Sequence, residues 1–282
     1  MKKIIAIVVA LTMVCTLAFV FTSCTGNKAP VNEEQSTEAE AAGSMTATEG
    51  VLVMATNAAF PPYEFVEGGD YAGIDVEIAG KIAEKLGMTL EIKDVEFGSI
   101  VGGVQTGKFD MGMAGMTVTE ERLQSVNFST SYATGIQVVI VAEDSAIASL
   151  DDLKGDGSMK FGVQQDTTGD IYASSSVEDG GYGEDNVIRY KTGADAVQAL
   201  KTGKVDAVII DNEPAKSFVA AVEGLKILDA EWAVEDYAIA IAKENTALLD
   251  AVNNALAELT ADGTVAGIIA KYIPAAAEDA TV

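Results

Sequence analysis

The stretch VQTGKFD at residues 104–110 returns as LKTGKVD at residues 200–206, 96 residues further along the chain. In each copy the glycine follows a segment with helical spacing, and a short apolar run begins after the aspartate. A glycine after a helix and a lysine near its end are common in proteins, so these residues alone assign no function. The repeated context nevertheless predicts two similar lobes, each with its own parallel sheet.

Strand and helix patterns alternate along the chain from residue 50. Ile78, Ile82 and Leu86 recur at every fourth residue and Gly87 follows, which predicts a helix that ends there. Strands separated by helices are typical of βαβ units and parallel sheets. Expected strands lie at 50–55, 90–92, 111–114, 136–141, 161–163, 187–190, 207–210 and 237–242, and expected helices at 74–86, 100–104, 169–176, 194–202, 214–222, 245–261 and 263–271.

The composition excludes several classes of function. The chain has 18 Lys and Arg against 43 Asp and Glu, a formal net charge of −25, so binding to a nucleic-acid backbone is not expected. It has no histidine, which excludes a Ser-His-Asp triad, a Cys-His dyad and a histidine metal site. Its two cysteines are too few for a disulfide scaffold or a four-cysteine zinc site. We therefore expect no metal and no cofactor.

The N-terminus has the features of an export signal. A basic start, an uncharged run over 4–21 and a small-residue end at Ser23 precede Cys24. The segment FTSC at 21–24 resembles the bacterial lipobox, whose cysteine is lipidated, so residues 1–23 are expected to be removed and Cys24 to carry a lipid. An uncleaved membrane anchor, with Cys24 an ordinary residue, is the alternative. Either way the protein is expected to be exported and held at the outer face of the cell membrane.

A polar segment follows the lipobox. Residues 24–48 contain only two large apolar side chains, so they cannot bury enough surface to offset their ordering entropy. We expect a disordered tether between Cys24 and the folded domain.

The repeated stretches also predict where a ligand binds. Ligands of open α/β sheets bind at the carboxyl ends of the strands. Five residues after the repeated aspartates stand Gly115 and Asp211, each at the end of an expected strand. If the two lobes face each other, Gly115 and Asp211 face one cleft from opposite sides. Nearby are Thr117 and Arg122 in the first lobe and Thr167 and Thr168 in the second.

Arg122 is a candidate anion-binding residue. Thr117 or Thr119 can cap the helix that begins here, which places Arg122 in the first turn. A cation at that end of a helix is electrostatically disfavoured, so its guanidinium gains most from a bound anion such as a carboxylate. The alternative is an exposed arginine paired with Glu120 or Glu121.

Asp211 is a candidate ammonium-binding residue. It directly follows the strand 207–210 and precedes a helix with Pro214 in its first turn, so it could equally be a helix N-cap. Arg122 on one lobe and Asp211 on the other would suit a zwitterion such as an α-amino acid. The aromatic residues Phe60 and Phe97 follow strands and could flank its side chain, although core packing is the ordinary role of a phenylalanine.

Seven segments, in this order, give the chain its resemblance to a known family. From about residue 51 to 273 it resembles the extracellular solute-binding proteins of polar amino-acid ABC importers. The segments are TNAAFPPYEF at 56–65, GIDVEIA at 73–79, TGKFD at 106–110, AGMTVTEER at 114–122, VQQDTTG at 163–169, VDAVIID at 205–211 and ADGT at 261–264.

The resemblance implies a two-lobed periplasmic-binding-protein type II fold of class α/β. Each lobe would be a mainly parallel sheet flanked by helices, and two hinge strands would join the lobes. Lobe I would comprise 49–137 and 235–273, lobe II 138–234, and 274–282 a tail. The implied partners are a free amino acid and a membrane permease with its ATPase, and the protein would be a monomer and not an enzyme.

The resemblance also assigns roles at the charged ends of the ligand. Arg122 would bind the α-carboxylate, helped by the backbone N–H groups of Thr117 and Thr168. Asp211, the Gly115 carbonyl and the Thr117 hydroxyl would bind the α-ammonium.

For the ligand side chain, the resemblance places Phe60 and Phe97 on its flanks and Asn57, Gln164 and Thr167 near its end. Relatives that bind basic ligands have an acid at the Asn57 position, so a neutral Asn57 argues against lysine or arginine. The pair at 114–115 is similar to the glutamine-type branch. Asp166 stands where many relatives have glycine, and we expect its carboxylate to point away from the site. A dehydratase on the same fold, or an amino-acid sensor acting in trans, are the alternatives.

Overall fold

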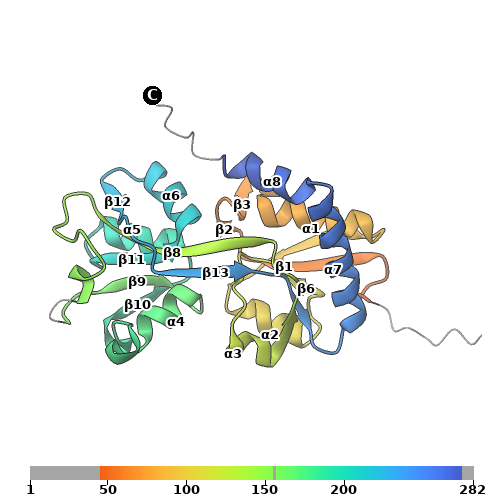
Figure 1. Ribbon diagram of the computed structural model, residues 1–282, viewed down its shortest axis with the longest axis horizontal. Coiled ribbons are helices and arrows are strands. Elements are labelled where there is room, and N and C mark those ends of the chain that lie inside the picture. The colour runs from red at the N-terminus through yellow and green to blue at the C-terminus, as the bar shows by residue number, and fades with distance from the viewer. Residues whose placement is uncertain (1–44, 155–156, 275–282) are drawn as a thin grey trace, which may run out of the picture. The chain divides into compact units, whose positions relative to one another are not determined.

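Two α/β lobes lie side by side, and two long strands run between them (Figure 1). The computed structural model describes residues 45–154 and 157–274. The strands that connect the lobes are β8 (Ala133–Ala142) and β13 (Ala233–Tyr237), which pair with each other antiparallel. The fold is the two-lobed type II architecture that the sequence predicts.

Lobe I is built on a five-stranded sheet of order β5-β1-β6-β14-β7. Three helices lie on one face and two on the other (Figure 1). The strands are β1 Val51–Thr56, β5 Thr89–Asp94, β6 Met111–Gly112, β7 Val126–Phe128 and β14 Ala240–Ala242. The helices are α1 Ile74–Lys85, α7 Thr246–Ala261 and α8 Thr264–Tyr272, and opposite them α2 Ser99–Gln105 and α3 Glu120–Ser125. A small antiparallel sheet is added by β2 Ala59–Phe60, β3 Glu64–Glu67 and β4 Asp70–Ala72.

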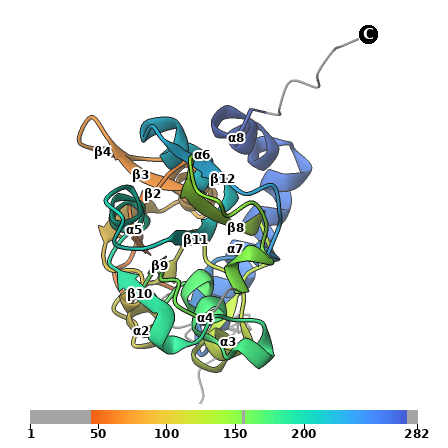
Figure 2. The same cartoon turned by 90° about the vertical axis from the view of Figure 1, so that its left-hand side faces the viewer.

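Lobe II repeats this arrangement, with helices on both faces of a sheet of order β10-β9-β11-β8-β12 (Figure 2). The remaining strands are β9 Phe161–Gln164, β10 Val187–Tyr190, β11 Ala207–Asp211 and β12 Leu225–Ile227. Helices α5 Gly193–Lys201 and α6 Asn212–Ala221 cover one face, and α4 Thr168–Ser174 covers the other. Three 3-10 helices lie at Asp152–Lys154, Val177–Asp179 and Glu184–Asn186.

The repeated heptapeptide occupies equivalent places in the two lobes. Gly107 and Gly203 end α2 and α5 with φ values of 71° and 70°, a left-handed conformation that glycine adopts without strain. Asp110 then accepts a hydrogen bond from the N–H of Val53 in the neighbouring β1, at 2.8 Å. Asp206 accepts the corresponding bond at 2.8 Å from the residue just before β9. The sequence echo is therefore a structural repeat.

The apolar residues that recur with helical period in α1 form its buried face. Ile74, Ile78 and Ile82 are fully buried and belong to one core cluster with Leu52 and Met54 of β1. Complete burial of such a side chain stabilises the fold by about 1.5–3 kcal/mol. The stripe fixes α1 against the sheet, and this holds the loops at the carboxyl end of β1 in place.

In each ordered sheet four strands run in the same direction, and one opposed strand lies between two of them: β14 pairs antiparallel with β6 and β7, and β8 pairs antiparallel with β11 and β12. One expectation about the strands is corrected. The single strand expected at 237–242 is two strands in different lobes: Tyr237 pairs with Ala133 in β8, whereas Ala240 pairs with Gly112 in β6. An unbroken apolar run carries no signal for such a change of partner.

The tether was expected to reach residue 48, but residues 45–48 contact the folded domain. Asp110 accepts a hydrogen bond from the Ala47 N–H, and the Asn245 side chain donates to the Met45 carbonyl. The predictions for residues 1–23, Cys24 and most of the tether and tail lie outside the described residues. Within 45–154 and 157–274, no helix has the length and apolar character needed to cross a membrane.

Candidate functional site

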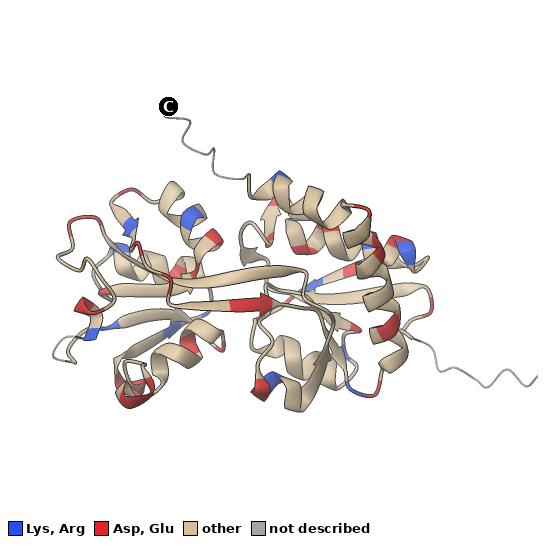
Figure 3. Cartoon of the chain, viewed as in Figure 1, with Lys and Arg blue, Asp and Glu red and all other residues tan. Residues whose placement is uncertain are grey.

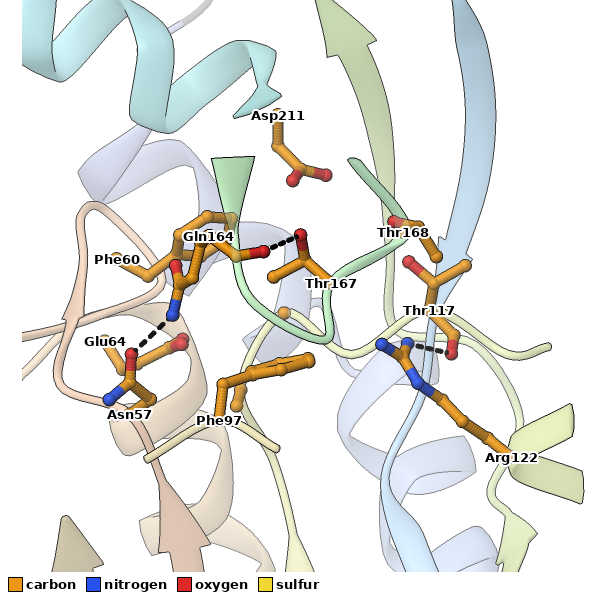
Figure 4. A pocket seen from close by; sticks show the side chains of 12 residues that line it. Asn57, Phe60, Glu64, Phe97, Thr117, Arg122, Gln164, Thr167, Thr168 and Asp211 are labelled. Atoms are coloured by element: carbon orange, nitrogen blue, oxygen red, sulfur yellow. Dashed lines mark hydrogen bonds between the residues drawn. The ribbon is translucent and has the colours of Figure 1, made fainter. Parts of the chain in front are cut away.

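A small pocket with a cavity volume of about 10 Å³ lies where the two lobes meet, at the carboxyl ends of β1, β9 and β11 (Figure 4). This is about the space that one water molecule needs, so the lobes are closed on each other. All ten residues singled out from the sequence line it, together with two that were not. The lining consists of Asn57, Phe60, Glu64, Phe97, Ala114, Gly115, Thr117, Arg122, Gln164, Thr167, Thr168 and Asp211.

Arg122 reaches the pocket from the first turn of α3. Thr119 caps this helix by accepting a hydrogen bond from the Arg122 N–H, as one of the two expected caps would. The guanidinium donates to the carbonyls of Thr117 at 2.8 Å and Asp166 at 3.0 Å, and it lies 5.2 Å from the centre of the Phe97 ring. These contacts fix the direction in which its remaining N–H groups point.

The Arg122 charge has no carboxylate partner within the described part of the chain. The alternative of a surface pair with Glu120 or Glu121 is therefore not what the structure has. Only 8% of the side chain is exposed, and burial lowers the pKa of the guanidinium. A buried cation without a counter-ion is costly, and this cost falls when an anion binds beside it.

Asp211 stands at the N-cap position of α6, yet its side chain makes no capping hydrogen bond. It accepts a hydrogen bond from the Tyr237 hydroxyl instead, and 7% of the residue is exposed. Burial raises the pKa of Asp211 to about 7, the Tyr237 hydrogen bond opposes this shift, and the nearby Glu235 charge adds to it. The carboxylate is therefore available to an incoming cation and gains from its arrival.

Backbone groups of Gly115, Thr117 and Thr168 complete this end of the pocket. Gly115 has φ 51°, and its N–H donates to the buried Asp75 carboxylate at 2.8 Å. Thr168 begins α4, so its N–H is one of the free donors at a helix N-terminus. Its hydroxyl donates to Glu235 at 2.9 Å. The threonine is thereby held in place by a residue of the connecting strand β13.

The opposite end of the pocket is lined by amides. The Gln164 side chain donates to the Asn57 oxygen at 2.9 Å, a hydrogen bond that joins the two lobes (Figure 4). Asn57 in turn donates to the Val95 carbonyl at 2.8 Å, and Thr167 donates to the Gln164 carbonyl at 2.8 Å. Figure 4 shows this pair and Arg122 at opposite sides of the pocket.

Glu64 is the pocket residue that the sequence reasoning missed. It follows Tyr63 as the first residue of β3, and its carboxyl reaches the pocket beside Asn57 (Figure 4). The residue is 1% exposed, and neither carboxyl oxygen accepts a hydrogen bond from a described donor. Burial and the neighbouring Asp75 raise its pKa well above the usual range. A charged residue between aromatic residues, just after two prolines, was the available signal.

Asp166 lies outside this pocket, as expected. It has φ 65°, a conformation that explains why glycine is common at such a position. Its carboxylate contacts Gly98 of the other lobe, and its carbonyl accepts from Arg122.

The charges around the pocket favour cations. Of the lining residues Arg122 is the one cation, whereas Glu64 and Asp211 are acids. Acidic residues are also distributed over both lobes (Figure 3), and the chain has more of them than basic residues. The site can therefore hold a carboxylate at Arg122 and donors or cations elsewhere.

A family comparison agrees with this geometry. Residues 52–275 match the sequence model of the family described as bacterial extracellular solute-binding proteins, family 3. The chain belongs to this family. Family 3 proteins are extracellular, so the chain is an exported protein, as its N-terminus predicts.

Several named binding proteins resemble the chain over most of their length. The arginine-binding extracellular protein ArtP of Bacillus subtilis is 32% identical over 224 residues, covering 78% of this chain and 85% of ArtP. The L-cystine-binding protein TcyJ of Escherichia coli K12 is 28% identical, covering 80% of this chain and 84% of TcyJ. An ancestral arginine-binding protein bound to glutamine has a TM-score of 0.73 at 37% identity, covering 80% of this chain and 99% of that one.

Proposed function

We propose that the protein is the substrate-binding component of an ABC importer and delivers a free polar L-amino acid to a membrane permease and its ATPase. The observation that carries this proposal is the unpaired, buried Arg122 on one side of a pocket whose other side holds Asp211. An α-amino acid supplies a carboxylate for the first and an ammonium for the second. The names of relatives that bind arginine, cystine or histidine support the same ligand class.

In this proposal the ligand backbone is bound by both lobes. Arg122 binds the α-carboxylate with the N–H groups of Thr117 and Thr168. Asp211, the Gly115 carbonyl and the Thr117 hydroxyl bind the α-ammonium. Because the first group belongs mainly to lobe I and Asp211 to lobe II, both ends are bound only when the lobes are together, so the ligand selects the closed state.

The ligand side chain points toward Asn57, Gln164 and Glu64, with Thr167 close by and with Phe60 and Phe97 on its flanks. Glu64 offers two free acceptor oxygens in a dry environment. A guanidinium, an ammonium or an amide NH2 can donate to it, whereas a side-chain carboxylate would be repelled. Glutamine and the basic amino acids therefore fit, and glutamate, which differs from glutamine by one group, does not.

Asn57 and Glu64 favour different ligands. A neutral Asn57 argues against a basic ligand, but Glu64 restores an acid at the same end of the pocket. The ancestral relative was solved with glutamine, and a second structure of an ancestral arginine-binding protein holds arginine. We propose that this pocket likewise accepts both kinds of ligand.

Export and anchoring complete the proposal. The lipobox-like FTSC segment supports cleavage before Cys24 and a lipid on Cys24, which would hold the receptor at the outer face of the membrane. The receptor is proposed to act as a monomer. A dehydratase on the same fold is the alternative. The relatives named above are binding proteins, which supports a receptor without catalytic activity.

Replacement of Arg122 tests the ligand class. In the purified folded domain, glutamine or arginine at a hundred times its dissociation constant should raise stability by about 2.7 kcal/mol and the melting temperature by about 2–4 °C. Arg122→Ala should abolish this shift, because the α-carboxylate loses its partner. Lys216→Ala removes an exposed cation of α6 outside the pocket and should leave the ligand-induced shift in melting temperature unchanged. Normal affinity in Arg122→Ala would show that the site is elsewhere.

A further inference from the structure

Two buried acids lie in and next to the pocket. Glu64 lines it, and Asp75, in the first turn of α1, is 0% exposed. Asp75 accepts hydrogen bonds from the Gly115 N–H at 2.8 Å and from the Tyr132 hydroxyl at 2.9 Å. The Asp75 N–H donates to the carbonyl of Tyr63, the residue before Glu64, at 2.9 Å, so the two acids come from backbone segments in direct contact.

The surroundings of this pair contain acids and no counter-ion. The charged groups that act most strongly on Glu64 are Asp75, Asp211 and Asp94, at the end of β5. The other titratable neighbours are tyrosine hydroxyls, including Tyr63. Neither Glu64 nor Asp75 takes part in an ion pair within residues 45–154 and 157–274.

Two ionised carboxylates cannot hydrogen-bond to each other, because neither has a hydrogen to donate. As a carboxylate, Glu64 has no partner for either oxygen. A proton held by two neighbouring buried acids removes one of their two charges. Neighbouring like charges in a dry site cannot both persist without a cation, which is the reason that carboxyl pairs retain a proton.

We propose that the Glu64–Asp75 pair holds one proton in the ligand-free protein and releases it to solvent when a cationic ligand side chain binds at Glu64. The inference rests on the proposed amino-acid receptor function. In the exchange one positive charge leaves the site as another enters, so the net charge of the site does not change. A neutral ligand such as glutamine leaves the proton in place, and the protonated Glu64 can donate to its amide oxygen.

Selection between basic and neutral ligands therefore depends on pH. Raising the pH removes the competing proton and favours arginine, whereas glutamine affinity is unaffected by this exchange. Both ligands present the same α-carboxylate and α-ammonium, so the ratio of their dissociation constants cancels the titration of Asp211. The ratio should change in favour of arginine by up to about tenfold per pH unit while one proton is released.

Calorimetric titration tests the exchange. Arginine and glutamine are titrated into the wild-type protein between pH 5.5 and 8, in pairs of buffers that differ in ionisation enthalpy. We expect close to one proton released per arginine near neutral pH and none per glutamine. Glu64→Gln should abolish the release and make the affinity ratio independent of pH. Glu67→Gln makes the same change at the exposed end of β3 and should behave as wild type.

The outcomes separate this inference from the function on which it rests. Binding of both ligands with no proton release and a constant ratio would overturn the exchange but leave the receptor intact. Binding of glutamine without arginine at every pH would do the same. Failure of the folded protein to bind any amino acid would overturn both. The wild-type buffer comparison decides the matter even if Glu64→Gln does not fold.

Discussion

At the scale of single residues, the charge of Asp211 depends on Tyr237. Burial raises the Asp211 pKa to about 7, and the hydrogen bond from the Tyr237 hydroxyl works against that rise. An ammonium ligand needs the ionised carboxylate, so its affinity should fall as the pH drops through this range. The tyrosine thus keeps the carboxylate usable near neutral pH.

Tyr237→Phe should move this dependence to higher pH. Without the hydroxyl, the Asp211 pKa rises further and less of the carboxylate is ionised at pH 7. A hydrogen bond to a charged group contributes about 1.5–3 kcal/mol, so glutamine affinity at pH 7 should fall about tenfold or more and recover in part above pH 8. Calorimetry from pH 6 to 8.5 measures the glutamine affinity of the variant, with Tyr190→Phe on β10 as the control. An unchanged pH profile would mean that Tyr237 does not tune Asp211.

At the scale of elements, each repeated aspartate ties its strand to a neighbour. Asp110 is 7% exposed and accepts two backbone N–H groups, from Ala47 and Val53. Asp206 is exposed and accepts one, from Lys160. A buried donor left without a partner costs more than one that water can reach.

Asp110→Ala should therefore destabilise the protein more than Asp206→Ala. We expect a loss of about 2–4 kcal/mol for the first, since two N–H groups lose their acceptor, and about 1 kcal/mol or less for the second. Urea unfolding of the two variants measures the difference. Equal losses would show that the equivalence in sequence outweighs the difference in burial.

The elements that the sequence predicts well are those whose signal is local. The isoleucine stripe of α1 and the glycine stops at 107 and 203 depend on near neighbours in the chain, and the structure confirms them. The break within 237–242 is set by partners far away in the sequence, which no local pattern records. Glu64 does not share this reason, because it pairs with Phe60 in a local hairpin of β2 and β3, and its signal was present in the sequence.

At the scale of the whole binding domain, pocket residues take part in the hydrogen bonds that join the two lobes. The Asn57–Gln164 bond and the bond from Arg122 to the Asp166 carbonyl both cross the cleft. The ion pair of Lys191 with Glu96 also crosses it, at 2.5 Å. Its side chains are 77% and 65% exposed, so it adds little. Closure and ligand binding consequently use the same residues.

Gly98 offers a way to oppose closure without touching the pocket. It precedes α2 with φ −62° and ψ −13°, a conformation open to alanine, but a Cβ there would overlap the Asp166 carboxylate of the other lobe. Gly98→Ala should leave lobe I intact and weaken ligand affinity by about fivefold, since the exposed Asp166 side chain can turn aside and the cost lies near the lower end of the 1–3 kcal/mol typical of overpacking. Adding Asp166→Gly removes the obstacle, relieves a positive φ and should restore affinity.

Gly102→Ala, in the same helix with open space around it, is the matched control. Calorimetry gives the affinities, and small-angle scattering with and without ligand gives the extent of closure. Equal affinity in Gly98→Ala would mean that the liganded lobes do not approach as closely as they do in this structure.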